Sequence, residues 1–334
     1  MRTLRIVLGA VAGLAAAELA VRLVTSPELD FSSFARPGLY CTDDAMNLAP
    51  ACANQSVMMR VPGEERYVPV KLNQWGFRGP YVNLTHGDHV VKRVLLVGGM
   101  SQGFGAGLVE DETYAAAAAR GSCGSVEIHN VAMPGIGAEV SWDIAERRVF
   151  RDLHFDHVIL ALYERVGHPD VAARVAPVAD QMADLAALNG LEFHFTRRFG
   201  SWFRHSALIV RTYDLLARAE LQLKWWRPRL TTTHPRGPEL KENASLAELI
   251  RVLTARASER GAAFSVLLLP WSGDTSDAQL QQMLPNTRFV DAHEAVRAAK
   301  LDDGRFPDGH YKPPTTAIIG KMVADEICRV DFTR

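Results

Sequence analysis

The chain of 334 residues carries almost no net charge and very few cysteines. Its 37 Lys and Arg residues nearly balance its 38 Asp and Glu residues, and the formal net charge is −1. No global field therefore attracts nucleic acid, and we expect no nucleic-acid partner. The four cysteines are not spaced as zinc ligands are, and neither are His129, His154, His157 and His168. We expect no metal site and interpret most of these histidines as surface or hydrogen-bonded core residues.

The sequence also lacks internal repeats and the motif of a phosphate-binding loop. Glycines are dense between residues 98 and 107, but no Gly-Lys-Ser or Gly-Lys-Thr sequence closes that segment. Such an ending supplies the phosphate-binding lysine, so we expect neither a nucleotide nor another cofactor. Hydrophobic residues make up 48% of the chain and charged residues 22%, which indicates an ordinary globular protein rather than a disordered one.

One long apolar run is present, from residue 6 to residue 24. Arg2 and Arg5 precede it, and positive residues before an apolar run keep the N-terminus in the cytoplasm. We expect residues 1–25 to form a single-pass signal anchor in the inner membrane. The bulk of the chain would then lie in the periplasm or another extracytoplasmic space.

Two alternatives to this anchor stay open. The run can be a cleaved secretory signal, because Ala15, Ala16 and Ala17 resemble a cleavage site. It can also be a buried amphipathic helix. We favour the uncleaved anchor because the run stays apolar beyond the alanines. Glu18 and Arg22 interrupt it, and their i,i+4 spacing lets them pair on one helix face.

The cysteines fit an oxidising compartment. Four cysteines allow three disulfide pairings. Cys41 and Cys52 lie close together in a loop-like stretch, whereas Cys123 and Cys328 are far apart in the sequence. We favour the pairs Cys41–Cys52 and Cys123–Cys328.

Local patterns divide the exported part of the chain into two regions. Residues 26–90 are rich in Pro, Asn, Gly and Asp and are interpreted as an extracytoplasmic stem and irregular lead-in. Residues 91–330 alternate between short apolar runs and helical patterns. The expected strands are 93–97, 126–131, 157–162, 263–269 and 288–291. The expected helices are 113–120, 138–151, 245–260 and 316–328. This alternation predicts a parallel sheet that helices cover on both faces.

A region at about 170–235 does not fit one strand–helix unit. It contains two helical stretches, 170–188 and 206–226, around an aromatic segment. We interpret it as a helical insertion at the carboxyl edge of the sheet, where such folds place ligand sites. It can form a lid, contact the membrane or only cover the core. Its basic cluster with Trp225 and Trp226 is typical of a helix end or a surface near lipid headgroups.

The segment 94–107 carries the first candidate for chemistry. A Val- and Leu-rich run stops at paired glycines, and Ser101 follows. A buried strand, a tight turn and an exposed hydroxyl are how an α/β enzyme presents a nucleophile. A serine needs a base, and His310 on a loop near the C-terminus is the best candidate, with Asp308 placed to orient its ring. The alternative is a glycine turn without chemistry.

Four blocks of this sequence resemble those of the SGNH (GDSL-like) hydrolases. The first is Gly99-x-Ser101 with two further glycines, and the second is 126–137 with Asn130, Pro134 and Gly135. The third is Asp308-x-His310. The fourth, residues 72–80, is similar to a lead-in segment of membrane-anchored bacterial members.

The resemblance implies a flavodoxin-like three-layer α/β/α sandwich and ester chemistry through an acyl-serine. It implies Ser101 as the nucleophile, His310 as the base and Asp308 as its partner. The backbone N–H groups of Ser101 and Gly135 would bind the oxyanion. Two positions depart from the pattern of the family. Met100 replaces the Asp before the serine, and Arg165 falls near the place of the asparagine that donates to the oxyanion.

Arg165 can act on the site in two opposite ways. Its guanidinium can stabilise an oxyanion through charge-assisted hydrogen bonds, or it can pair with Glu164 and block the pocket. We therefore expect a membrane-anchored serine esterase or O-acyltransferase acting on acyl or acetyl esters of envelope or exported glycans. The alternative is a non-catalytic SGNH-like binding or structural subunit of a membrane-associated assembly. The expected partners are the membrane, through the N-terminal helix, a glycan or other ester, and further membrane proteins.

Overall fold

The computed structural model describes most of the α/β region and parts of the segments before it. The described residues are 2–24, 30–31, 53–54, 56–61, 64, 66–85, 91–134, 136–163, 206, 208, 212, 239–270, 276–301, 304–307 and 309–330. Apart from three residues, the expected insertion at about 170–235 lies outside them.

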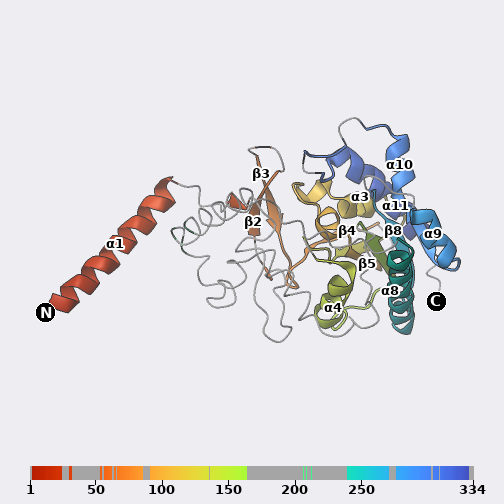
Figure 1. Cartoon of the computed structure of the whole chain (residues 1–334), viewed down its shortest axis with the longest axis horizontal. Coiled ribbons are helices and arrows are strands. Elements are labelled where there is room, and N and C mark those ends of the chain that lie inside the picture. Colours follow the sequence, from red (N-terminus) through yellow and green to blue (C-terminus); the bar gives the residue numbers. More distant parts are fainter. Residues whose placement is uncertain are drawn as a thin grey trace.

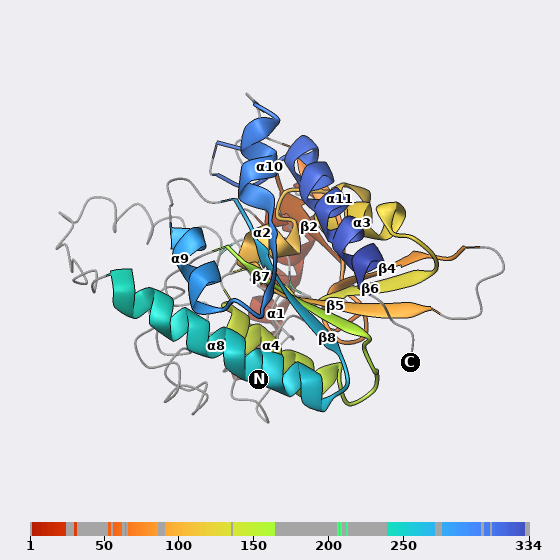
Figure 2. The same ribbon diagram turned by 90° about the vertical axis from the view of Figure 1, so that its right-hand side faces the viewer.

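A six-stranded sheet forms the centre of the molecule, in the order β4-β6-β5-β7-β8-β9 (Figure 2). Its strands are β4 (Arg78–Asn83), β5 (Lys92–Gly98), β6 (Val126–Asn130), β7 (His157–Leu162), β8 (Ala263–Leu268) and β9 (Arg288–Asp291). β4 runs antiparallel to β6, and the other neighbours are parallel. The five expected strands are therefore present, with ends that differ by at most one residue.

Helices cover both faces of the sheet, which gives a three-layer α/β/α fold (Figure 2). One face carries α3 (Tyr114–Gly121), α10 (Ala292–Ala298) and α11 (Pro313–Arg329), and the other carries α4 (Ala138–Arg148) and α8 (Glu239–Glu259). The short elements α2 (Met100–Phe104), η1 (Glu110–Glu112) and α9 (Ser276–Met283) complete the described helices of this region.

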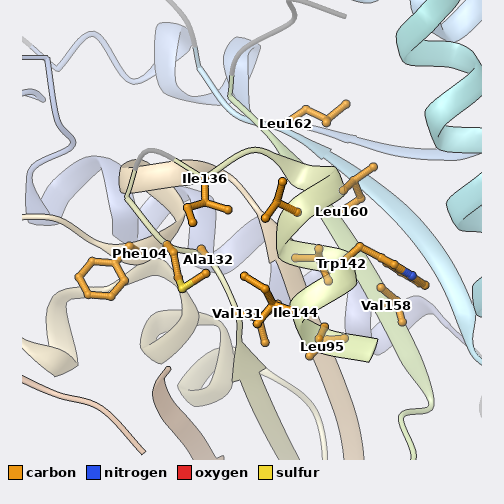
Figure 3. Close-up of a cluster of buried hydrophobic side chains, with 14 of the residues drawn as sticks. Leu95, Phe104, Val131, Ala132, Ile136, Trp142, Ile144, Val158, Leu160 and Leu162 are labelled. Carbon is orange, nitrogen blue, oxygen red and sulfur yellow. The ribbon is translucent and has the colours of Figure 1, made fainter. Parts of the chain in front are cut away.

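The core explains why the strands read as continuous apolar runs. In β5, Leu95 and Val97 belong to the hydrophobic cluster under α4 and α8, whereas Val94 and Leu96 belong to the cluster under α3 and α11. Figure 3 shows the first cluster, with Trp142 facing the strands. A strand buried on both faces needs apolar residues at every position, which is the pattern of the sequence.

The strand order reverses direction at β5. From β5 the chain continues to β6 on one side, and β7 then pairs with the opposite side of β5. Open parallel sheets bind ligands outside the carboxyl ends of the strands where the order reverses in this way. Ser101 follows β5 directly, so the topology by itself brings it to this place.

Two helices begin earlier than expected. α8 begins at Glu239 and not at Ser245, and α11 begins at Pro313 and not at Thr316. The Ser245–Glu248 pair resembles a capping box but lies inside a longer helix. Pro313 and Pro314 lie at the first positions of α11, where their missing N–H groups cost no intrahelical hydrogen bond. α4 ends at Arg148, three residues before the expected end at 151.

The lead-in is more regular than the sequence predicts. β1 (Asp30–Phe31), β2 (Ser56–Arg60) and β3 (Tyr67–Lys71) form a small sheet, and β4 belongs to the main sheet although it precedes residue 91. Val68 and Val70 are buried in the same cluster as Leu95. The expectation of an irregular segment up to residue 90 is therefore wrong for these strands, since alternation over five residues is too short to stand out.

The N-terminal helix α1 (Arg2–Val24) stands apart from the α/β layers (Figure 1). Glu18 and Arg22 pair on it at 2.7 Å, as expected. Glu18 also accepts hydrogen bonds from Ser206 Oγ at 2.8 Å and from the Leu208 N–H at 2.9 Å. None of the helices in the described part of the chain has the length and apolar character that crossing a membrane requires.

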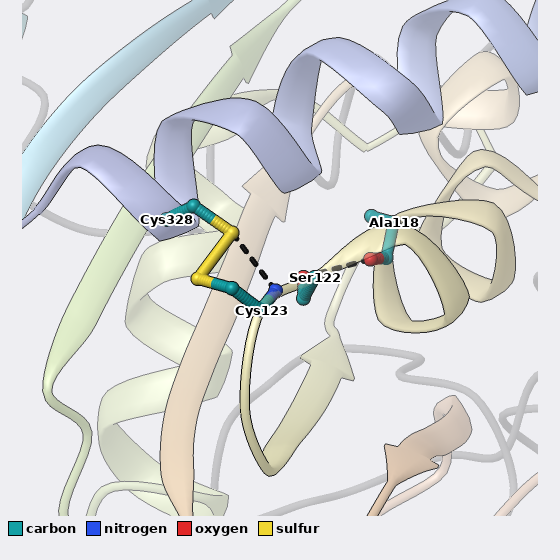
Figure 4. Close-up of a disulfide and its surroundings, with 4 residues drawn as sticks. All are labelled: Ala118, Ser122, Cys123 and Cys328. Atoms are coloured by element: carbon teal, nitrogen blue, oxygen red, sulfur yellow. Dashed lines mark hydrogen bonds between the residues drawn. A yellow bond between two sulfur atoms is a disulfide. The ribbon is translucent and has the colours of Figure 1, made fainter. Parts of the chain in front are cut away.

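A disulfide joins Cys123, after α3, to Cys328 in the last turn of α11 (Figure 4). The Cα atoms lie 5.6 Å apart, and the two residues are 205 positions apart in the sequence. This confirms the predicted Cys123–Cys328 pair. Cys41 and Cys52 lie outside the described residues.

Candidate active site

The turn after β5 presents Ser101 through three residues with positive φ. These are Gly98 (80°), Gly99 (76°) and Met100 (50°). A Cβ on Gly98 would lie 2.6 Å from the Ala161 carbonyl oxygen, so only glycine fits there. Met100, where the pattern that the sequence resembles has Asp, holds a conformation that L-residues rarely adopt. Strained backbone of this kind clusters at functional sites, where the surrounding structure enforces it.

Contacts with the end of β6 hold α2 in place. A Cβ on Gly103 would lie 2.5 Å from the Gly98 carbonyl oxygen and 2.8 Å from the Ala132 Cβ. The side-chain amide of Asn130 donates to the Gly103 carbonyl at 2.8 Å and accepts from the Ala132 N–H at 3.1 Å. Asn130, part of the second block of the resemblance, thus orients the helix that carries Ser101.

Arg78 secures the other end of α2. Its guanidinium is fully buried and donates to the carbonyls of Phe104 (3.2 Å), Gly105 (2.9 Å) and Leu108 (3.1 Å). It also pairs with Glu110 at 3.1 Å. These carbonyls lie at and beyond the end of a helix of five residues and need donors, which a planar guanidinium supplies from one side. The sequence identifies residues 72–80 only as a block, so it does not predict that Arg78 binds these carbonyls.

The structure brings Ser101 and His310 together. His310 Nε2 lies 2.8 Å from Ser101 Oγ, although the two residues are 209 positions apart. The His310 side chain is buried, with 8% of its surface exposed, and Ser101 is partly exposed. This is the distance that a base needs to take the hydroxyl proton. Nε2 accepts that proton in the tautomer that carries hydrogen on Nδ1.

The loop that carries His310 is tied to the carboxyl end of β8. Arg305 donates to the Gly309 carbonyl at 3.2 Å and to the Pro270 carbonyl at 2.8 Å. The Tyr311 hydroxyl also donates to Pro270, at 2.6 Å. The ring of Tyr163, directly after β7, meets that of Tyr311 edge-on. Three neighbouring strand ends, those of β5, β7 and β8, therefore meet at the site.

Other expected members of the site lie outside the described residues. These are Asp308, Gly135 and Arg165. Of the expected site, the structure therefore describes Ser101, with its backbone N–H, and His310. It adds Gln102, Arg78, Arg305 and Tyr311, which the sequence did not single out.

Two histidines with lowered pKa values belong to the core and not to this site. His157 Nε2 lies 2.9 Å from Ser265 Oγ. His157 is the first residue of β7, at the end of that strand away from the candidate site. Burial, reinforced by Arg288, lowers the pKa of His157 to about 3. Burial also lowers the pKa of His129, although Glu127 at 3.0 Å opposes this. Both agree with the expectation of hydrogen-bonded core histidines.

His154 is exposed, and His168 lies outside the described residues. Within the described ranges, no group of three or more His, Cys, Asp and Glu side chains could hold a metal ion.

No protein-family model matches the chain, and no curated protein matches it significantly.

Proposed function

We propose that the chain is a serine esterase or O-acyltransferase of the SGNH type, with Ser101 as the nucleophile. The observation that carries the proposal is the 2.8 Å contact between Ser101 Oγ and His310 Nε2. It occurs at the reversal point of a parallel sheet, on a turn with strained backbone at Met100. The order of the four sequence blocks supports the same conclusion.

The geometry suits acyl transfer in two halves. His310 takes the Ser101 proton as Oγ attacks the acyl carbonyl carbon, and the tetrahedral oxyanion meets the Ser101 N–H. His310 then gives the proton to the leaving alkoxide, and an acyl-serine remains. In the second half, water or a sugar hydroxyl loses its proton to His310 and attacks the acyl carbon. His310 returns this proton to Ser101 Oγ as the acyl–Oγ bond breaks, which restores the free serine. We assign Asp308 to the orientation of the imidazole, and Gly135 with Arg165 to the oxyanion.

The proposed substrates are acyl or acetyl esters of envelope or exported glycans, as in the anchored proteins that the sequence resembles. The extracytoplasmic location is supported by the Cys123–Cys328 disulfide, because disulfides persist in oxidising compartments. We propose that α1 attaches the domain to the inner membrane, with Arg2 and Arg5 in the cytoplasm. Large apolar side chains exposed on α1 support this, among them Ile6 (69%) and Leu14 (62%).

An activated acetyl ester tests the catalytic proposal. We expect the full-length protein to hydrolyse p-nitrophenyl acetate and a fluorophosphonate to label Ser101. Ser101→Ala and His310→Ala should reduce turnover to the spontaneous rate. Equal turnover by Ser101→Ala and the parent would contradict the proposal. A folded parent that neither turns over nor becomes labelled would favour the non-catalytic binding or structural subunit.

Membrane extraction tests the location. We expect the chain to stay with membranes in alkaline carbonate and its bulk to be digested only by protease added on the extracytoplasmic side. Release into the soluble fraction by carbonate would contradict the anchor.

A further inference from the structure

The side chain of Gln102 lies buried between the helix of the nucleophile and the loop of the base. It directly follows Ser101 on α2, and only 4% of its surface is exposed. A buried carboxamide needs hydrogen-bond partners for both its N–H group and its oxygen, because an unpaired polar group away from water destabilises the fold.

Both ends of this carboxamide bind the backbone on either side of His310. Gln102 Oε1 accepts from the Tyr311 N–H at 3.0 Å, and Nε2 donates to the Gly309 carbonyl at 3.2 Å. The two bonds and the Ser101–His310 contact therefore join the same helix to the same three residues of the loop. A shift of the loop along α2 would lengthen all of these contacts together.

We propose that Gln102 is a positioning residue that sets the distance between Ser101 Oγ and His310 Nε2. The inference rests on the proposed function, since it assigns that distance to catalysis. Arg305 and Tyr311 bind the same loop to the Pro270 carbonyl, beyond β8. Gln102 instead fixes the loop against α2, which is the element that carries the nucleophile.

Gln102→Leu tests this role, because leucine is apolar and close in size and removes both hydrogen bonds. A misplacement of about 1 Å between reacting groups costs about 10²-fold in rate, so we expect kcat to fall by about that factor. KM for p-nitrophenyl acetate should change little, because the carboxamide bonds backbone groups of the protein itself. Gln282→Leu, at an exposed position of α9, is the control and should keep the parental kcat.

The ¹⁵N NMR signals of the His310 imidazole test the positioning role of Gln102 without a measurement of turnover. Ser101→Ala should change the ¹⁵N chemical shifts of the His310 imidazole in the parent, because the two side chains touch. In the Gln102→Leu background the same substitution should leave these shifts unchanged. If Gln102→Leu fails to fold, Gln102→Glu replaces it. This variant keeps the length and the acceptor for Tyr311, but it places a carboxylate oxygen against the Gly309 carbonyl and should show the same losses.

Two results would overturn the inference. One is a parental kcat in the folded Gln102 variant, and the other is an equal response of the His310 shifts to Ser101→Ala in both backgrounds. Failure of the proposed function looks different, because parent and Ser101→Ala would then hydrolyse the ester alike. In that case the imidazole shifts still decide whether Gln102 holds His310 against Ser101.

Discussion

Gly103 lies where α2 passes over the end of β6, and its lack of a side chain permits that approach. The Gly98 carbonyl and the Ala132 methyl group occupy the space that a Cβ would take. Gly98 belongs to the turn before Ser101, and Ala132 follows the end of β6, so neither neighbour can move without moving Ser101. The position of Ser101 therefore depends on the absence of one methyl group at Gly103.

We expect Gly103→Ala to destabilise the protein by about 2 kcal/mol, as overpacking typically does, and to reduce ester turnover more than tenfold. Thermal unfolding and turnover of p-nitrophenyl acetate measure the two effects. Gly137→Ala is the control, because its φ is −69° and a Cβ would meet only the flexible carboxylate of Glu139. Equal effects of the two substitutions would show that close packing at Gly103 is unimportant.

A second residue-scale feature is the buried chain of polar groups that begins at His157. Ser265 Oγ donates to Glu326 at 2.6 Å, so it accepts from His157 Nε2, and Arg288 lies 3.5 Å from the same carboxylate. A neutral imidazole suits this chain, which agrees with its lowered pKa.

The protein should therefore lose stability in mild acid. His157 in the unfolded chain binds a proton below about pH 6.5, whereas in the folded chain it does so only below about pH 3. Between these pH values the unfolded state binds more protons than the folded state. The stability that neutral His157 contributes above pH 6.5 therefore falls as the pH is lowered, by up to about 1.4 kcal/mol per pH unit. We expect His157→Gln to flatten this slope in urea unfolding measured from pH 7 to pH 4. An unchanged slope would assign the acid sensitivity to other groups.

At the scale of the element, α2 is too short to hold itself in place. Its five residues are fixed from three directions, by Asn130 at Gly103, by Gln102 at the His310 loop and by Arg78 behind its last turn. An isolated helix of this length is unstable in water, so tertiary contacts must supply its stability.

Arg78→Met should destabilise the domain by about 3 kcal/mol, because three carbonyls and the Glu110 carboxylate lose a buried donor. Arg151→Met, at a side chain that is 76% exposed, should change stability by less than about 0.5 kcal/mol. Denaturant midpoints of the two variants provide the comparison, and similar midpoints would contradict this role of Arg78.

At the scale of the whole molecule, the disulfide connects the first and last parts of one helical layer. α3 and α11 pack side by side on the same face, and Cys123–Cys328 closes a loop of about 200 residues between them (Figure 4). Closing a loop this long restricts the unfolded chain strongly, with a typical effect of about 2–5 kcal/mol.

Replacing both cysteines by serine should therefore lower the free energy of unfolding by about that amount and leave the Ser101–His310 geometry in place. Dithiothreitol should lower the melting temperature of the parent by more than that of the double variant, in which only Cys41 and Cys52 remain to be reduced. If the reductant lowers both equally, the stabilisation comes from elsewhere in the chain.

The sequence predicts the layers of this molecule better than the details of its site. The apolar run from Val94 to Val97 predicts a strand, because burial on both faces requires apolar residues at each position. The pairing of Ser101 with His310 is predicted because the loops that follow parallel strands meet at the same edge of the sheet. Gln102 and Arg78 are not predictable in the same way. Their side chains form hydrogen bonds with backbone groups that come close only in the folded chain. No sequence pattern predicts where those backbone groups will lie.

Ser206 and Leu208 illustrate the same point in the insertion. The sequence predicts a helix from Ser206, but it does not predict that Glu18 of α1 would accept from both residues. Such a contact between distant segments is a property of the fold and leaves no local signal.

The position of His310 has a consequence for the order of folding. Ser101 and His310 are 209 positions apart, and Cys123 and Cys328 are 205 positions apart. Contacts between residues so far apart close a long loop of chain, and the entropy of that closure must be offset by the structure that forms between them. The Ser101–His310 contact and the disulfide therefore both depend on the completed sheet, and a partly folded chain would lack both.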